Sequence, residues 1–497
     1  MRNKYTTLNI KQKVRIYSIP FLIISVLIVT MESFSTTTPL KKCWEKQGKI
    51  IDKNLVTFYF NEELNKLGHN FKPWEKTKYS ICGNIWVNQN RFLKNDTLTT
   101  KRKRKYYSKI EYYKNTLLHV DYGKKTLSPI TNKMYLEQLI KSARYSPIYL
   151  LNYFVENTNK LATKTSPESN IYSINIGKTP VELHINKSTN LINKITYLTY
   201  DELYGDVVTS YIYSSYKKSK TLNYPSKIKI KKINGKVVDK VAIYNLEIIP
   251  DKLQLLYKPN DYKFIPSTIE TKTQIKTEKY NDFIHFINLI HTEDKIMVVE
   301  FEDFMLVAEA PLNSRNGELI ISEVKKIAPS KPIKYFVFGH HHPHYLGGVR
   351  AFVHKEATIL CTKISKEYIG YIGNAPHSIQ PDSLHFEPKK LKTQTIQDSL
   401  IIGNKNKLNI YFIGEKSAHT KDYLIYYFPK EKLLFQDDLC WIPKTGVIGK
   451  ANARQRGLYN SIQELKLNVK TIIQSWPVES HKVKTIIPFQ DLEKSMQ

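Results

Sequence analysis

The sequence predicts an α/β C-terminal domain of layered sheets and helices, preceded by a β-rich α+β N-terminal domain. The chain has 497 residues, more than the roughly 100 to 200 residues of one ordinary domain. Up to about residue 275, apolar residues recur at every second position, the pattern of half-buried strands. Beyond it, short apolar strands alternate with amphipathic helices, which favours an α/β layered domain over an all-β one.

The first segment is expected to direct export. A basic N-terminus precedes the apolar run Ile19–Met31, and the small residues Ser33 and Ser35 follow it. The run is shorter than the ~20 residues that cross a bilayer comfortably, and the small residues suit a cleavage site. Residues 1–35 are therefore expected to be a signal peptide or an uncleaved membrane anchor. The protein would then be periplasmic, or associated with the membrane on its outer side.

Net charge does not select a partner. The formal charge of +31 invites a nucleic-acid or anionic-membrane interpretation. The excess is nearly all Lys, however, and it is spread along the chain together with Asn, Ile and Tyr, as a compositional bias of the source genome would also produce. We therefore do not favour nucleic acid, and we expect a small-molecule or envelope-derived substrate.

The four cysteines are too few for a disulfide-dense framework, and they lack the C-x-x-C spacing of a zinc site. In an oxidising compartment Cys43 and Cys82 could pair. Free, buried thiols fit the sequence equally well.

Residues 45–275 are predicted to form the β-rich domain. Its strands are expected around NLVTFYF, NIYSINI, VELHINK, LINKITYLTY, VVTSYIYSSY and KIKIKKI. INKSTNLINK and KKINGKVVDK predict hairpins. One helical segment is predicted in MYLEQLIKSARYSPIYLLNYFVE, with one apolar face made by Leu136, Leu139, Ile140 and Ala143 and a break at Pro147. A polar connection with three prolines places the boundary near residue 276.

Residues 276–497 are predicted to form the α/β domain. Strands are expected in KIMVVEF, FMLVAEA, YFVFG, ATILC, LNIYFIG, YLIYYF, KLLFQ and TIIP. Helices are expected in GELIISEVKKIA, from about Gly347, over Ile364–Ile369 and in GLYNSIQELKLN.

A histidine cluster follows the strand YFVFG, in the segment FGHHHPHYLGG. Residues two apart in an extended chain point to the same side, so His340 and His342 are expected to present their imidazoles together, with His341 facing away. Pro343 keeps His342 extended, and His344 is expected on the same side as well. Neutral imidazole is a good zinc ligand, but catalytic zinc sites usually take three protein ligands.

Further candidate ligands follow other strands. A third histidine, His419, lies in GEKSAHTKDY, and two acidic residues, Asp437 and Asp438, lie in LLFQDDL. Because loops at strand ends can converge at one edge of a layered sheet, these side chains are expected near the first cluster.

Together these pieces resemble the metallo-β-lactamase superfamily, whose first motif reads H-x-H-x-D-H-x-G-G and is followed by a ligand His and then an Asp. His340, His342 and the pair Gly347–Gly348 match the first motif, His419 matches the third ligand, and Asp438 matches the aspartate that often bridges two metals. The resemblance covers about residues 280–497. It implies an αββα sandwich and bound zinc.

The departures from this pattern fall mainly on the second metal site. His344 and Tyr345 stand where the motif has Asp and His, and Asp437 replaces the glycine before the aspartate. The late P-G-H element is replaced by Pro488–Gln490. The resemblance thus implies one firmly held zinc on three histidines. His344 and Asp438 are left as further metal ligands, or as catalytic groups that orient water or take its proton.

The function predicted from this site is that of an exported zinc-dependent hydrolase, because zinc lowers the pKa of a bound water. Esters, thioesters, lactams, phosphodiesters and sulfate esters remain open as substrates. A catalytically degenerate relative that acts as a metal- or ligand-binding envelope protein is one alternative. Another is an N-terminal domain that binds lipid or an anionic polymer, with the second domain as its scaffold.

Overall fold

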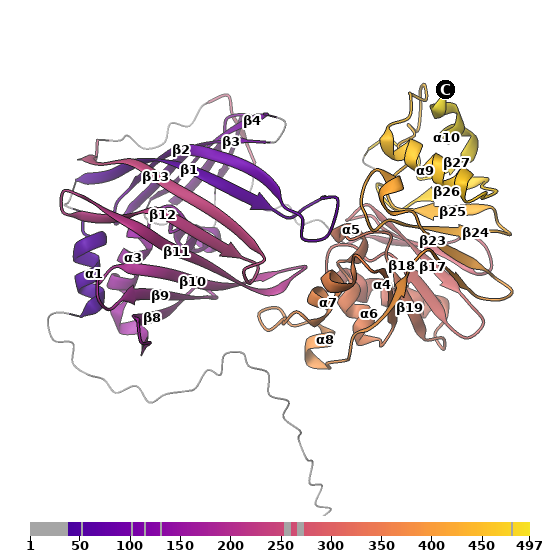
Figure 1. The fold of residues 1–497 in the computed structure, drawn as a ribbon, viewed down its shortest axis with the longest axis horizontal. Helices are drawn as coiled ribbons and strands as arrows, with labels where there is room; N and C mark the ends of the chain where they lie inside the picture. Colours follow the sequence, from indigo (N-terminus) through magenta and orange to yellow (C-terminus); the bar gives the residue numbers. More distant parts are fainter. Residues whose placement is uncertain are drawn as a thin grey trace, which may run out of the picture. The chain divides into compact units, whose positions relative to one another are not determined.

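Three β-sheets run through the part of the chain that the structure describes (Figure 1). The structure is a computed structural model, and it describes residues 38–50, 53–100, 103–113, 116–129, 132–252, 260–265, 273–478 and 481–497. The expected signal peptide or anchor, residues 1–35, lies outside them. None of the described helices is both long enough and apolar enough to cross a membrane. The fold is mixed α/β and rich in strands.

The first sheet has fourteen strands in the order β14-β6-β5-β4-β3-β2-β1-β13-β12-β11-β10-β9-β8-β7. Its strands are β1 (Asn54–Lys66), β2 (Thr77–Val87), β3 (Arg91–Thr99), β4 (Lys105–Tyr113), β5 (Thr116–Asp121), β6 (Thr126–Pro129), β7 (Ala162–Thr165), β8 (Ser169–Ile176), β9 (Thr179–Asn186), β10 (Ile192–Asp201), β11 (Gly205–Ser219), β12 (Leu222–Lys232), β13 (Val237–Pro250) and β14 (Lys263–Phe264). All six predicted strands and both predicted hairpins, β9–β10 and β12–β13, are confirmed.

One face of this sheet is covered by helices. On β12, Ile228 and Ile230 are buried in the shared core, whereas Lys227 and Lys229 are exposed on the other face. This is the period-two alternation that the sequence shows. The helices on the buried side are α1 (Pro39–Gln47), α2 (Asn132–Ser142) and α3 (Ile148–Glu156), and the short η1 (Thr158–Lys160) follows α3. The predicted helical segment contains α2 and α3, and Pro147 lies between them as the predicted break.

Two smaller sheets form the rest, called here the C-terminal layers (residues 275–497). The seven-stranded sheet contains β15 (Ile275–Lys279), β16 (Ile284–Leu289), β17 (Asp294–Glu300), β18 (Met305–Ala308), β19 (Ile333–Val337), β20 (Thr358–Thr362) and β21 (Lys392–Ile396). The six-stranded sheet contains β22 (Ser399–Ile402), β23 (Leu408–Phe412), β24 (Leu424–Phe428), β25 (Leu433–Gln436), β26 (Thr471–Gln474) and β27 (Ile486–Pro488). Strands β18 to β21 are parallel, as are β25 and β26.

The C-terminal layers are ordered helix, sheet, sheet, helix, and strand alternation explains this order. On β17, Met297 and Val299 belong to a core between the two sheets, whereas Ile296 and Val298 face a second core under helices. Both faces are therefore buried, which gives the continuous apolar runs of the sequence. The elements outside the sheets are α4 (Ser314–Ile327), α5 (Pro343–Leu346), α6 (Val349–His354), α7 (Lys366–Asn374), α8 (Ser383–Phe386), η2 (Gly414–Ser417), α9 (Ala453–Glu464) and α10 (Phe489–Met496).

The paired glycines of the histidine segment are explained by a close approach of helices α4 and α6. A Cβ atom on Gly317 of α4 would lie 2.4 Å from the carbonyl oxygen of Gly348 and 2.8 Å from Cβ of Ala351. A Cβ on Gly347 would lie 2.3 Å from the backbone of Leu312. The glycines thus let the backbone that follows the histidines lie directly against α4.

We expect Gly317→Ala to lower the free energy of unfolding by about 1–3 kcal/mol, because backbone atoms must move to admit the methyl group. Gly370→Ala is the matched control. Gly370 also lies in a helix, α7, and its added Cβ meets nothing within 4 Å. It should raise stability by roughly 0.5–1 kcal/mol. Urea denaturation of the two variants checks the pair, and equal effects would contradict the packing argument.

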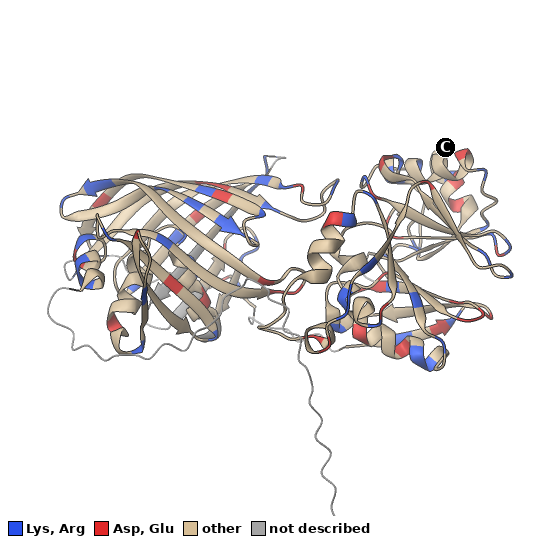
Figure 2. Ribbon diagram, turned by 60° about the horizontal axis from the view of Figure 1, so that its bottom comes forward, with Lys and Arg blue, Asp and Glu red and all other residues tan. Residues whose placement is uncertain are grey.

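All four cysteines are unpaired, so the pairing of Cys43 with Cys82 does not form. Cys43 is buried in the helix-covered core of the large sheet, and burial raises the pKa of its thiol. Lys and Arg occur on the large sheet and on the C-terminal layers alike (Figure 2). Pro39–Gln497 forms one compact unit, so the domain boundary near residue 276 stays a prediction.

Candidate metal centre

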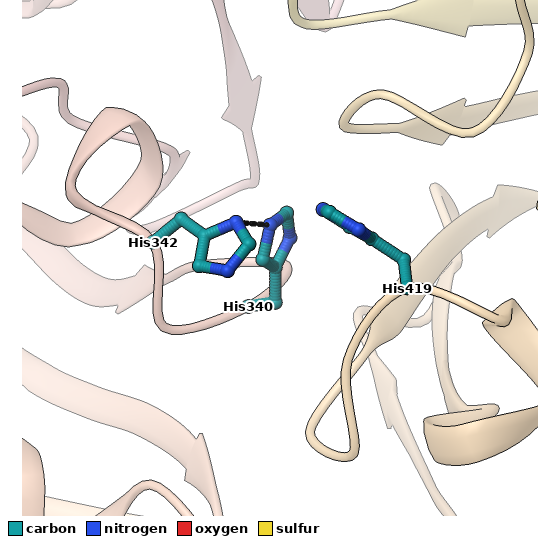
Figure 3. Close-up of side chains that lie close together, drawn as sticks. All are labelled: His340, His342 and His419. Carbon is teal, nitrogen blue, oxygen red and sulfur yellow. Dashed lines mark hydrogen bonds between the residues drawn. The ribbon is translucent and has the colours of Figure 1, made fainter. Parts of the chain in front are cut away.

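Three histidines from two loops converge in the C-terminal layers. His340 and His342 directly follow the parallel strand β19, and His419 lies between η2 and β24. One ring nitrogen from each lies within 4.8 Å of those of the other two. Figure 3 shows the three rings facing one another, with His340 between the others. The side chains are 0%, 2% and 9% exposed in chain order, so the cluster is shielded from bulk water.

The protonation pattern of His342 is fixed by a backbone carbonyl. Its Nε2 lies 3.0 Å from the carbonyl oxygen of Asn70, in the loop between β1 and β2. A carbonyl can only accept, so Nε2 carries the proton and donates it. The Nδ1 atom of a neutral His342 is then an unprotonated lone pair. It lies 2.9 Å from Nε2 of His340.

His340 is held by a buried carboxyl group in the same manner. Its Nδ1 lies 2.6 Å from Oδ2 of Asp437, and both side chains are fully buried. A neutral His340 that donates from Nδ1 presents the lone pair of Nε2 to His342. Gly339 makes room for this contact, because a Cβ there would lie 2.1 Å from Oδ2 of Asp437. In that tautomer the lone pairs of both rings are directed to the space between them, an arrangement suited to two ligands of one cation.

His419 completes the group. Its loop turns through Ala418, which has a left-handed φ of 52°, and Ser417 Oγ accepts a hydrogen bond from the His419 amide. His419 Nε2 lies 3.1 Å from Oδ2 of Asp438, but the geometry does not make a hydrogen bond. Asp438 Oδ2 is instead bonded by Arg454, at 3.1 Å. A buried imidazole nitrogen without a hydrogen bond is thus aimed at the other two rings.

Burial sets the charge of the cluster. Burial lowers the pKa of His340 well below its ordinary value, and the neighbouring imidazoles of His342 and His419 lower it further. The pKa of His342 is lowered for the same kinds of reason. Beneath them, burial raises the pKa of Asp437, and it raises that of Glu309 to about 8. At neutral pH the rings of His340 and His342 are therefore uncharged and able to ligate a metal.

His344 does not lie where the sequence predicted it. Pro343 begins the short helix α5 instead of prolonging the extended chain, as proline at the first helical position often does. The helical turn leaves His344 outside the trio whose ring nitrogens lie within 4.8 Å of one another, and its Nδ1 contacts both oxygens of buried Asp294 at 3.1 and 3.2 Å. Burial lowers the pKa of His344, but the Asp294 carboxylate more than offsets this, so the pKa is raised. His341 faces away as predicted, and its Nδ1 lies 2.9 Å from Asp422.

Three contributors to this site were not predicted. Asp437 was expected near the histidines and lies there, whereas Asp294 has no signal beyond its place at a strand start. Asn70 and His69 lie far away in the chain, and the His69 ring is centred 4.7 Å from that of His342. No local pattern could have identified them, because their contacts exist only in the tertiary fold.

The donor set fits a transition metal. Three imidazole nitrogens, Nε2 of His340, Nδ1 of His342 and Nε2 of His419, lie together. The other nitrogens of His340 and His342 are held by a carboxyl group and a carbonyl oxygen. Such outer partners fix ring orientation in known metal sites. Three protein ligands leave one position open, as in catalytic zinc sites.

Comparisons with known proteins return structures only. No protein-family model matches the chain, and no curated protein does. A metallo-beta-lactamase from Pontibacter korlensis is similar at a TM-score of 0.34 and 15% identity, over 45% of this chain and 97% of that one. The metallo-beta-lactamase FIM-1 from Pseudomonas aeruginosa, in a mono-zinc form, is similar at a TM-score of 0.34 and 18% identity. The match covers 45% of this chain and 93% of that one. A metallo-beta-lactamase from Hirschia baltica is similar at a TM-score of 0.32 and 15% identity, over 45% of this chain and 96% of that one. At these TM-scores the similarities carry no argument about chemistry.

Proposed function

We propose that this chain is an exported, zinc-dependent hydrolase of the metallo-β-lactamase superfamily, with one firmly held metal. The observation that carries the proposal is the buried trio of His340, His342 and His419, in which one ring nitrogen from each residue lies within 4.8 Å of the other two. The helix–sheet–sheet–helix order of the C-terminal layers and the sequence motif support it. Export is supported by the apolar N-terminal run alone.

The three imidazoles would hold the zinc through the nitrogens named above, with Asp437 and the Asn70 carbonyl keeping two of the rings in orientation. When bound, zinc supplies a Lewis acid that polarises a carbonyl or phosphoryl oxygen and acidifies water. A carboxylate beside a histidine orients the ring and stabilises its protonated form. We assign that role to Asp294, so that His344 exchanges a proton with water or the leaving group.

Asp438 is assigned a supporting role. Its Oδ2 lies between His419 and Arg454, at 3.1 Å from each. The carboxylate can accept a hydrogen bond from water at the open position, while Arg454 holds it in place. Arg454 also competes with a second cation for this oxygen, which favours one metal over two. A site that has lost its second metal would also fit a second candidate function, that of a catalytically degenerate, metal-binding envelope protein.

Purified protein separates the two functions. We expect one zinc per chain by elemental analysis, and turnover of a generic ester or phosphodiester that is lost on chelation and restored by zinc. His344→Gln should keep the zinc and lose about a hundredfold or more in kcat, since a positioned general acid or base contributes roughly 10²–10⁴-fold. His354→Gln, also on a helix, is the matched control and should behave as wild type. Bound zinc without turnover on a broad ester, lactam and phosphodiester panel supports the degenerate protein, and absence of zinc refutes both.

A further inference from the structure

We propose that the loop between β1 and β2, residues 67–76 (the hairpin loop), is a positioning element of the metal centre, although it belongs to the large sheet. The inference rests on the proposed function only for the identity of the ion. Its geometric basis is that two consecutive carbonyl groups of the hairpin loop bond the two segments that carry the histidines.

One of these hydrogen bonds orients the His342 ring, and the other holds the loop that carries His419. The carbonyl oxygen of Asn70 accepts from Nε2 of His342 at 3.0 Å. The next carbonyl, of Phe71, accepts from the amide of Lys421 at 2.7 Å, two residues after His419. The hairpin loop thus bridges the β19 segment to the segment before β24. These two segments come from different sheets.

The hairpin loop is internally braced, so its carbonyls have defined directions. Glu75 accepts from the amides of Phe71 and Lys72 through Oε2, at 3.0 and 3.2 Å. The Asn70 side chain donates to the carbonyl of Glu75 at 2.6 Å and accepts from the Thr77 hydroxyl at 2.5 Å. An unbraced loop would lose conformational entropy on forming the same two bonds.

Trp74 anchors the hairpin loop on the C-terminal layers. Its indole nitrogen donates to Glu367 of α7 at 2.5 Å, and the Nζ of Lys236, itself paired with Glu367, lies 4.7 Å from the ring centroid. The ring centroid lies 4.9–5.6 Å from those of three tyrosines: Tyr204, Tyr368 and Tyr371. Aromatic contacts of this kind contribute about 0.5–1.5 kcal/mol each beyond area burial.

The consequence is a metal centre that is incomplete without the large sheet. Without the Asn70 carbonyl, the Nε2–H of His342 loses its acceptor, and the ring is free to place its proton on Nδ1, the atom needed for the metal. The His69 ring, also in the hairpin loop, is centred 4.7 Å from that of His342 and tilted by 33° to it. Outer partners of metal-binding histidines typically contribute about 10–100-fold to metal affinity.

The test is a full-length variant in which residues 67–76 are replaced by Asn-Gly. Lys66 pairs directly with Thr77, so a two-residue turn closes the hairpin without changing the strand register. We expect its zinc Kd, measured by chelator competition, to rise about 10–100-fold. Trp74→Ala should also raise the zinc Kd, but by less than the loop replacement does. Trp86→Ala, at the other end of β2, is the matched control and should leave the Kd unchanged.

Two further measurements do not depend on zinc. In metal-free protein with ¹⁵N-labelled histidine, NMR should show His342 protonated at Nε2 in the wild type and shifted toward Nδ1 in the Asn-Gly variant. Hydrogen exchange should show the Lys421 amide protected only in the wild type. An unchanged tautomer and unchanged protection would overturn the positioning role, even if zinc binds. Wild-type protein that binds no zinc but shows both signatures keeps the positioning role and refutes the proposed function alone.

Discussion

Replacing His419 with alanine is expected to abolish tight zinc binding and to reduce kcat/KM by about a thousandfold or more. The variant keeps two ligands, whereas catalytic zinc sites use three. The charge stabilisation that a metal supplies is worth several kcal/mol, and each 1.36 kcal/mol corresponds to about tenfold in rate. The fold should survive, because Asp438 keeps its pairing with Arg454. Zinc content after gel filtration and the initial rate at substrate concentrations well below KM measure the two effects.

His385→Ala is the control for this experiment. His385 is an exposed histidine on α8 in the same C-terminal layers, so its loss should change neither zinc content nor rate. If His419→Ala retained one zinc per chain and wild-type turnover, the trio would not be the metal centre. The hydrolase proposal would then be wrong.

The second large effect concerns stability. Asp382→Ala is expected to lower the free energy of unfolding by about 3–5 kcal/mol, because it leaves the buried Arg350 guanidinium without its counter-ion. Arg350 bonds both carboxylate oxygens, at 2.6 and 2.9 Å, and its side chain is 4% exposed. It also donates to the carbonyl groups of Gly373 and Ala375. One pair thereby holds α6, the end of α7 and the start of α8 together.

Two comparisons and a pH series check this prediction. Glu464→Ala removes an exposed ion pair with Lys416 and should cost less than about 1 kcal/mol. The double variant Arg350→Met with Asp382→Leu removes both charges and should recover much of the loss. Similar losses in Asp382→Ala and Glu464→Ala would show that the buried pair is not critical.

The pH dependence follows from the Asp382 pKa. Burial raises this pKa and the bonds from Arg350 lower it by more, to about 2. Because the folded-state pKa is lowered, the stabilisation is present above the unfolded pKa of about 3.9 and is lost as pH falls towards 2. The stability advantage of wild type over Asp382→Asn should therefore narrow between about pH 4 and pH 2. Denaturation at fixed pH values measures it.

Local pattern was sufficient to predict most elements. Alternation identified strands such as β12, and helical spacing identified the segment of α2 and α3, with Pro147 marking the break between them. The helix expected over Ile364–Ile369 is α7, which begins at Lys366 and runs on to Asn374. The continuity of fourteen strands in one sheet was not predictable, because strand order is set by long-range pairing such as that of β1 with β13.

The candidate site likewise contains features that local sequence predicts and features that it does not. The spacing of His340 and His342 is a property of the extended chain, so their joint presentation follows from sequence. His344 was misplaced because the pattern did not show that Pro343 begins a helix. Asp437 was expected near the histidines, but its pairing with His340 was not specified. The Asn70 carbonyl was not predicted, since backbone acceptors carry no residue signature.

The bond from His342 to Asn70 joins residues separated by 272 positions. Contacts of such separation close late in folding, because loop entropy must be overcome first. A nascent chain would expose Asn70 long before His342 is synthesised, and domains generally acquire structure in that order. Tight binding of metal would then report completed maturation of the whole chain, and a truncated or misassembled product would hold zinc more weakly.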